Sequence, residues 1–314
     1  MAESLALLAA FSFGCANVMV KKGTKPNSIN NGTFLSILIT FFLAGGIALG
    51  KGLLEGWVIF TAEGIWWFIL AGILTAFIGR THLFTSIQHL GSVRASAIKR
   101  LNPLFAVLIG IFFLHEALNT WIIIGIICIF GSSVVLMYES FIVARKNKKN
   151  VPASKQEKAG NGQFNKLKMI ARFGYVYGVI SAFAYAIGYV VRKEGLEEMP
   201  DPYMGTMIGA LVGILVLLIL SLFQKRYRQS IQSTFSSFQP WLFGAGIATS
   251  LGQILYFAAL SQNGVSQVAV IASTDVIFTL FLSSMVFKTN EAITKKVIFA
   301  SITAMVGAGL IASV

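Results

Sequence analysis

The pattern of hydrophobic and polar positions divides the chain into ten long apolar segments, each bounded by charged residues or by Gly, Pro and Asn. In hydrocarbon, backbone N–H and C=O groups must pair within their own segment or in a closed barrel. These runs lack the alternation of barrel strands. We therefore predict an all-α membrane protein with ten transmembrane helices, at residues 4–20, 33–50, 65–88, 92–114, 119–138, 173–191, 203–223, 240–261, 265–287 and 293–313.

The composition supports a membrane protein. Only 12% of the 314 residues are charged, 56% are hydrophobic, and the mean hydropathy is +0.76. Soluble domains carry about 25% charged residues, so an ordinary soluble enzyme, a disordered protein and a fibrous repeat are excluded. The first apolar run lacks a charged leader, and we expect a retained helix. Cys15 and Cys128 lie inside apolar runs, so no disulfide is expected.

Residues 140–172 are the one long polar stretch, and they carry much of the net charge of +13. We interpret them as a solvated basic linker between residues 1–139 and 173–314. Binding of anionic lipid head groups is the alternative, and no nucleic-acid partner is expected. The Lys and Arg residues of the stretch are Arg145, Lys146, Lys148, Lys149, Lys155, Lys158, Lys166, Lys168 and Arg172.

The two halves resemble each other in order along the chain. The stretches starting at Trp67 and Trp241 match, and so do the ends of the first and sixth segments, at Val20 and Val191. Gly32 matches Gly205 and Gly91 matches Gly264. Such self-similarity indicates an internal repeat. Because each half holds an odd number of helices, the second half is inverted, and a substrate site is expected between the halves near the midplane.

Lys and Arg outside the segments cluster in the loops after the odd-numbered helices. By the positive-inside rule these loops, including the linker, face the cytoplasm and both termini lie outside.

Segment 82–137 carries a recognisable pattern. A helix rich in Ala leads to Pro103, a turn with His115 and Glu116 follows, and the next helix holds Gly125 and Gly131. This pattern resembles the EamA-type repeat of the drug/metabolite transporter superfamily. His115 stands where that repeat has Gly, and in the second half Val276 stands where Pro103 stands.

The resemblance implies ten helices in two inverted five-helix repeats around a cavity lined by helices 1, 3, 4, 6, 8 and 9. It also implies cytoplasmic termini, the opposite of the orientation that the charges predict.

Charged side chains inside the segments are costly in lipid and mark candidate sites. Arg80, Lys99 and Arg100 fall at similar depths on two helices joined by a turn, so they can cluster in one plane. Because Lys99 and Arg100 are adjacent on a helix, we expect one to face the cavity and the other a neighbouring helix or the surface. Arg94 lies near a helix start, and we expect it to snorkel to the interface, with a ligand role as the alternative.

Asp275 is the only acidic residue well inside a predicted segment. It either neutralises Arg80 or Lys99 across the repeat interface or forms a proton or substrate-amine site. His82 could join a proton relay, although a lone His in a bundle is more often only hydrogen-bonded. The cations outnumber this acid, which favours an anionic or zwitterionic substrate held by Arg.

Further cavity candidates are polar or aromatic. Asn102 aligns with Asp275 across the repeats, and Gln253 and Tyr256 lie in the eighth segment. Tyr189 shares a helix face with Tyr185 and could line a pore or simply pack. The remaining candidate is Asn17, for which hydrogen bonding between helices is the favoured role.

The chain has no Walker loop, nucleophile elbow or metal-binding Cys/His spacing, so no catalytic residue, cofactor or metal is expected and ATP-driven transport is excluded. We predict a secondary active transporter working by alternating access in a prokaryotic plasma membrane. It would export an amino-acid-like anion or zwitterion, coupled to protons or a counter-solute. The alternatives are uptake or exchange of a nucleotide-like or phosphorylated solute, and a non-transporting scaffold or receptor. The sequence does not predict the oligomeric state.

Overall fold

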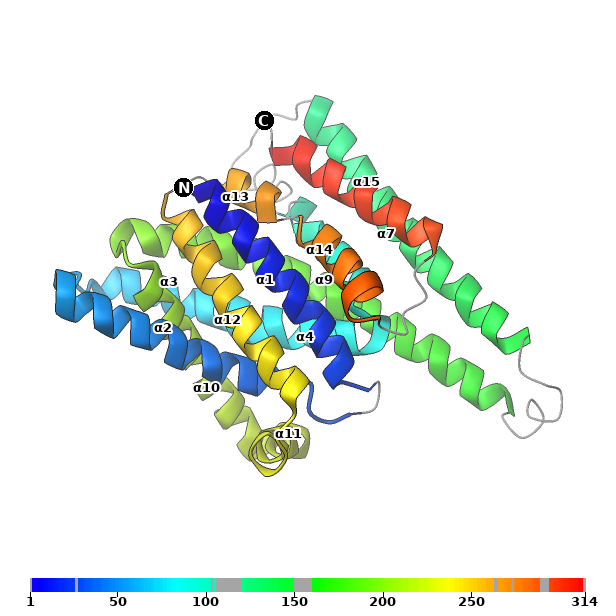
Figure 1. Ribbon diagram of the computed structural model, residues 1–314, viewed down its shortest axis with the longest axis horizontal. Coiled ribbons are helices and arrows are strands. Elements are labelled where there is room, and N and C mark those ends of the chain that lie inside the picture. Colours follow the sequence, from blue (N-terminus) through cyan, green and yellow to red (C-terminus); the bar gives the residue numbers. More distant parts are fainter. Residues whose placement is uncertain are drawn as a thin grey trace.

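A computed structural model gives the fold and describes residues 2–25, 28–102, 104–105, 120–149, 160–262, 265–272, 274–288 and 294–312. All regular structure in these ranges is helical, as predicted (Figure 1). The helices lie side by side in a bundle in which α7 and α15 form one flank and α2, α3 and α10 the opposite flank.

The helices of the first half follow the predicted apolar segments. The π-helix η1 continues directly from α3 into α4, so residues 62–90 form one long helical rod. The bounds are α1 Ala2–Gly23, α2 Thr33–Glu55, α3 Ala62–Ala71, η1 Gly72–Gly79, α4 Arg80–Leu90, α5 Ser92–Lys99 and α7 Thr120–Lys149.

The second half contains α9 and the helices after it. Its elements are α9 Gly160–Glu198, α10 Pro202–Phe223, α11 Lys225–Ser236, α12 Pro240–Leu260, α13 Val265–Ala272, α14 Asp275–Phe281, the π-helix η2 Leu282–Val286 and α15 Lys295–Ala312. The short polar helix α11 was not predicted. Helices α7 and α9 extend into the predicted linker, and α9 continues past the predicted end at Val191.

Local sequence sets the helix ends. Asp201 precedes α10 and accepts hydrogen bonds from the backbone N–H groups of Tyr203 and Met204, both at 2.9 Å, with Pro202 as the first helical residue. Gly91 has φ 97° and joins α4 to α5 in a turn that a residue with a side chain adopts only with strain.

Six helices are long and apolar enough to cross a membrane: Ala2–Gly23, Thr33–Glu55, Ala62–Leu90, Phe173–Glu198, Pro202–Phe223 and Pro240–Leu260. Shorter apolar helices run over Ile123–Leu136 and Asp275–Val286. The chain is therefore an integral multi-pass membrane protein, and the count of ten spans stays a prediction.

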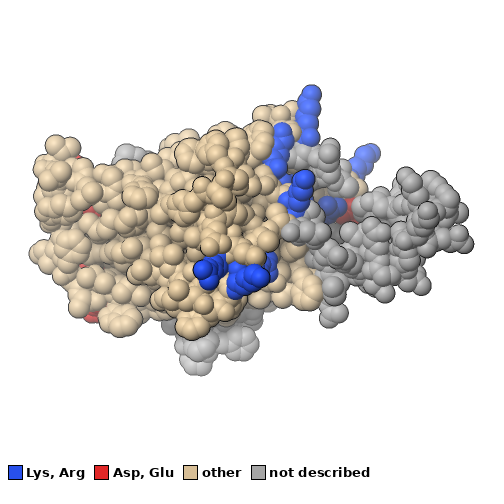
Figure 2. All heavy atoms as spheres, turned by 90° about the horizontal axis from the view of Figure 1, so that it is seen from below, with Lys and Arg blue, Asp and Glu red and all other residues tan. Residues whose placement is uncertain are grey.

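The bundle is apolar outside and partly polar inside. Large apolar side chains such as Leu54, Trp66 and Phe223 are exposed, whereas Arg80, Lys99 and Asp275 are buried. In the view of Figure 2 most of the described surface carries neither charge, and the blue Lys and Arg side chains gather on one part of it. This distribution suits a protein whose solvent is lipid, because charged side chains there need the shelter of the protein interior.

Helices distant in sequence pack together. The largest contacts join α1 to α12, α15 to α7, α2 to α10 and the rod of α3, η1 and α4 to α9. The short helix α5 contacts α14, α9 and α1. Residues 99–100 and 275 therefore meet near the middle of the bundle.

The closest crossing is made by two glycines. A Cβ atom on Gly72 would lie 2.7 Å from both the Cα and the carbonyl oxygen of Gly209 on α10. Backbone atoms cannot move away by a change of rotamer as a flexible side chain can. This helix crossing therefore requires a residue without a side chain at position 72.

We predict that Gly72→Ala lowers the unfolding free energy by about 1–3 kcal/mol because it forces two backbones apart. Gly46→Ala is the matched control, since a Cβ at Gly46 meets nothing within 4 Å and the gain in helix propensity is the same. Unfolding in mixed detergent micelles, followed by tryptophan fluorescence, measures both. Equal stability of the two variants would contradict the packing argument.

Candidate central binding site

The candidate site forms where two helices are interrupted. Helix α5 ends at Lys99, Arg100 is in a turn, and residues 101 and 102 are helical again. In the second half α13 ends at Ala272, and α14 begins at Asp275 after a turn at Thr274. Broken helices inside a membrane are tolerated only where protein or a cavity shelters the backbone, and transporters use such breaks to bind solutes.

A buried carboxylate lies between two cations at these breaks. Arg100 Nη2 donates a hydrogen bond to Asp275 Oδ1, and Lys99 Nζ lies 3.8 Å from Asp275 Oδ2. The Asp275 side chain is fully buried, and the two cations are each 7% exposed. Because removing a charge from water is costly, each member of this cluster depends on the others.

The expectation that Lys99 and Arg100 must point to different places was wrong, since both reach Asp275. A separation of about 100° between neighbours holds only along a continuous helix. Here α5 ends at Lys99, so the turn at Arg100 lets two long side chains approach one carboxylate from different directions.

Lys99 is positioned without a hydrogen bond among the described residues. Its Nζ lies 4.7 Å from the ring centre of Phe13 and 5.1 Å from that of Tyr185. These cation–π contacts and the longer ion pair hold the ammonium group. Its three N–H donors remain available to an acceptor in the cavity.

Arg80 lies at the start of α4, 1% exposed, but does not pair with Asp275. Its Nη1 donates to Thr40 Oγ1 at 2.9 Å and to Ser36 Oγ at 3.5 Å on α2. Thr40 is in turn 2.8 Å from Ser250 on α12. Of the two partners weighed for Asp275, the structure supports Lys99 and excludes Arg80, whose partners are neutral hydroxyls.

Arg192 is a functional candidate that the sequence interpretation missed. It is buried on α9, and it donates to Gln253 Oε1 and to Thr75 Oγ1, each at 2.7 Å. The predicted sixth segment ends at Val191, which leaves Arg192 in a loop. The signal was present: Tyr185, Tyr189 and Arg192 are spaced by four and three, which places them on one helix face.

Three tyrosines form an aromatic wall beside these cations. The ring centres of Tyr185 and Tyr189 lie 5.5 Å apart, and those of Tyr189 and Tyr256 lie 4.6 Å apart. All three side chains are buried, and Tyr256 Oη has no hydrogen-bond partner among the described residues. The wall combines flat apolar faces with a free hydroxyl.

A small cavity lies between the cations and this wall. Its volume is about 20 Å³, and it is lined by Phe13, Lys99, Arg100, Asn102, Tyr189, Tyr256, Ala269 and Ala272. A void of this size holds about one water molecule, so the cavity is too small for a metabolite in this conformation. Five sequence-predicted residues meet here, namely Lys99, Arg100, Asn102, Tyr189 and Tyr256, with Asp275 directly behind the two cations.

The structure places the other predicted site residues elsewhere. Asn17 donates to Ser96 Oγ at 2.8 Å and to Thr279 Oγ1 at 3.5 Å, so it joins α1 to α5 and α14. Gln253 accepts the bond from Arg192. His82 contacts its own helix, with Nδ1 2.7 Å from the carbonyl oxygen of Ile78, and lines a different cavity.

Arg94 was expected to snorkel, and this was wrong. It is buried, and its Nη2 donates to Glu139 Oε2 at 2.7 Å. Glu139 Oε1 accepts from Thr294 at 3.1 Å. Asp275 is therefore not the only acid buried in the bundle, because Glu139, just beyond the predicted end of the fifth segment, is buried too. His115, Glu116 and Pro103 lie outside the described residues.

Comparison with protein families gives a single clear answer. The model of the EamA-like transporter family matches residues 1–138 and 172–313. The chain belongs to this family. The resemblance seen in segment 82–137 is thereby confirmed, and the chain is assigned to the membrane transporters of small solutes.

The comparison with curated proteins gave no match. Chains of several solved structures resemble this chain, among them a crystal structure with a TM-score of 0.58 and 16% sequence identity. The likeness covers 98% of this chain and 96% of the other. At this identity it concerns the fold alone, and it extends over nearly the whole of both chains.

We predict that Asp275→Asn lowers the unfolding free energy by about 3 kcal/mol or more, because it leaves two buried cations without their carboxylate. Asp201→Asn is the control: it also removes one carboxylate, but Asn caps a helix about as well as Asp. Its ion pair with the partly exposed Lys51, at 3.7 Å, contributes little. Unfolding in mixed micelles compares the two, and an equal loss in both would show that the Asp275 cluster has no special role.

Proposed function

We propose that this EamA-family protein is a secondary active transporter of small organic anions or zwitterions, with its substrate site at the cavity beside Lys99 and Arg100. One observation carries the proposal. Among the described residues, Lys99 and Arg100 line the cavity, and Arg80 and Arg192 are two more buried cations of the same interior whose partners are neutral, whereas Asp275 is the one carboxylate that these four cations share. A carboxylate or phosphate on the substrate would offset the excess.

Buried hydrogen-bond donors without an acceptor support a substrate that carries an acidic group. Lys99 has no hydrogen bond, and the Nε groups of Arg80, Arg100 and Arg192 have no partner among the described residues. Buried donors are normally satisfied. Oxygen atoms of a bound anion would accept from those that face the cavity, while Phe13 and Tyr189 would contact its apolar part.

We further propose that the halves, residues 1–139 and 173–314, are inverted five-helix repeats joined by the basic segment 140–172. The family matches leave out residues 139–171, nearly the same segment. The helix contacts agree with an exchange of the halves: α1 packs on α12 as α9 packs on α3–η1–α4, and α1 packs on α13 as α9 packs on α5. The breaks at Arg100 and Thr274 are separated along the chain by the same interval as Trp67 and Trp241.

We infer alternating access from the small size of the cavity and the proposed symmetry of the halves. A space that holds about one water cannot admit a metabolite until the walls separate. Rocking of the two halves about the breaks would open the cavity to one side and then to the other. Export of an amino-acid-like substrate, coupled to protons or to a counter-solute, is the form of transport that we propose.

The test is a screen of purified protein for thermal stabilisation by a metabolite library, repeated with Lys99→Ala. We expect wild-type protein to be stabilised by organic anions or zwitterions, and the variant to lose at least half of the shift, because the cation nearest the cavity is gone. Gly46→Ala serves as the control variant that keeps the site intact. Stabilisation only by cations or neutral compounds would contradict the proposal, and a response only to nucleotides or sugar phosphates would favour the phosphorylated-solute alternative.

A further inference from the structure

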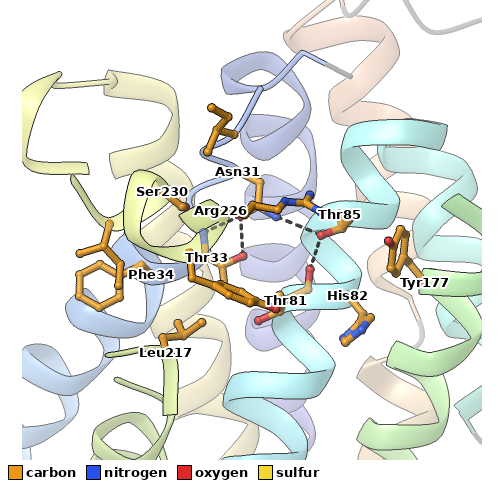
Figure 3. Close-up of a pocket in the computed structure, with 13 residues that line it drawn as sticks. Asn31, Thr33, Phe34, Thr81, His82, Thr85, Tyr177, Leu217, Arg226 and Ser230 are labelled. Carbon is orange, nitrogen blue, oxygen red and sulfur yellow. Dashed lines mark hydrogen bonds between the residues drawn. The ribbon is translucent and has the colours of Figure 1, made fainter. Parts of the chain in front are cut away.

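A second cavity lies apart from the central one, where the beginning of α2, the middle of α4 and the polar helix α11 meet (Figure 3). Its volume is about 100 Å³, and it shares no lining residue with the central cavity. The residues that matter for its chemistry are Asn31, Thr81, Thr85, Arg226 and Ser230.

Part of the cavity wall is already fixed by internal hydrogen bonds. Asn31 Nδ2 donates to Thr85 Oγ1 at 3.2 Å, and Thr85 Oγ1 donates to the carbonyl oxygen of Thr81 at 2.7 Å (Figure 3). These bonds join the segment before α2 to α4. The wall is therefore preorganised, and its remaining polar groups are the ones open to a ligand.

Two of those groups have no partner among the described residues. The hydroxyl oxygen of Thr81 is buried and makes no hydrogen bond. Arg226 is exposed and makes neither an ion pair nor a hydrogen bond with the described residues, and in Figure 3 its side chain extends from α11 toward Asn31 and Thr85. A buried hydroxyl without a partner and a guanidinium without a protein partner line the same cavity, and an oxyanion there could accept hydrogen bonds from both.

Helix α11 adds to the positive potential of this cavity. Its first turn contains Lys225, Arg226 and Arg228, and the side chain of Gln224 makes no cap bond there. The N-terminus of a helix carries a partial positive charge, and the three cationic side chains at this end are repelled by that charge. A bound anion would offset the repulsion. The helix is held in place by Phe235, which packs on the cavity-lining Phe34 with ring centres 6.1 Å apart.

We propose that this cavity binds a small oxyanion, a carboxylate or phosphate group, through the Arg226 guanidinium and the hydroxyls of Thr81 and Ser230. The volume equals that of about three water molecules, which suits one anionic group but not a whole metabolite. The group could belong to a dissolved solute or to a lipid head group, because both present the same oxygens. The site is independent of the central cavity.

Inorganic phosphate is the probe, with thermal unfolding of the full-length protein in neutral detergent as the readout and chloride keeping the ionic strength constant. We expect phosphate to raise the midpoint of wild-type protein by about 2 °C or more when well above its dissociation constant. Arg226→Gln should lose this shift. Arg228→Gln, the same change on the same helix but outside the cavity lining, should keep it. Since phosphate also strengthens apolar burial in every variant, only the difference between variants counts.

Thr81→Val removes the orphan hydroxyl at nearly constant shape and should weaken the response without loss of charge. A second arm replaces phosphate by nanodiscs containing phosphatidylglycerol, compared with phosphatidylcholine alone. Loss of stabilisation in Arg226→Gln only in this arm would assign the anion to a lipid. Equal responses of wild type, Arg226→Gln and Arg228→Gln in both arms would overturn the site. The central proposal is unaffected by that result, since its test depends on Lys99.

Discussion

The architecture depends on the pairing of one buried carboxylate, Asp275, with Lys99 and Arg100. Each of these residues lies at a break in a helix, and a break in lipid exposes backbone groups that only protein or a cavity can satisfy. None of the three charges could remain alone at this depth, because desolvation without a partner costs several kcal/mol per ion. The helix breaks, the ion cluster and the cavity therefore exist together.

Two further arginines extend this polar centre across the halves of the chain. Arg192 of the second half donates to Thr75 in the first, and Arg80 of the first half reaches Ser250 in the second through Thr40. Any movement of one half against the other must stretch or exchange these bonds. An anion bound among the same cations would stabilise one relative position of the halves more than another. Such a difference in binding free energy is required if binding is to drive the movement.

The sequence predicts the fold class and much of the centre, because lipid makes buried charge rare and therefore informative. Lys99, Arg100, Asn102, Tyr189, Tyr256 and Asp275 were all selected from their positions in apolar segments, and the structure brings them together. The errors share one cause. An interpretation from sequence spacing assumes ideal, continuous helices. It therefore predicts different directions for Lys99 and Arg100, ends the sixth segment before Arg192 and places Arg94 at the membrane interface. It also overlooked Glu139 as the partner of Arg94. Helix breaks and tertiary partners of this kind arise from packing between distant segments, which no local pattern contains.

The central claim is that the cavity binds negative charge. Its most direct test is equilibrium binding of matched ligand pairs to purified protein, in which the strongest carboxylate ligand is compared with its own neutral amide. The two differ in charge and hardly in shape. We expect the carboxylate to bind at least about tenfold more tightly, a difference of about 1.4 kcal/mol, and to lose that advantage in Lys99→Ala. Equal or tighter binding of the amide by wild-type protein would contradict the account.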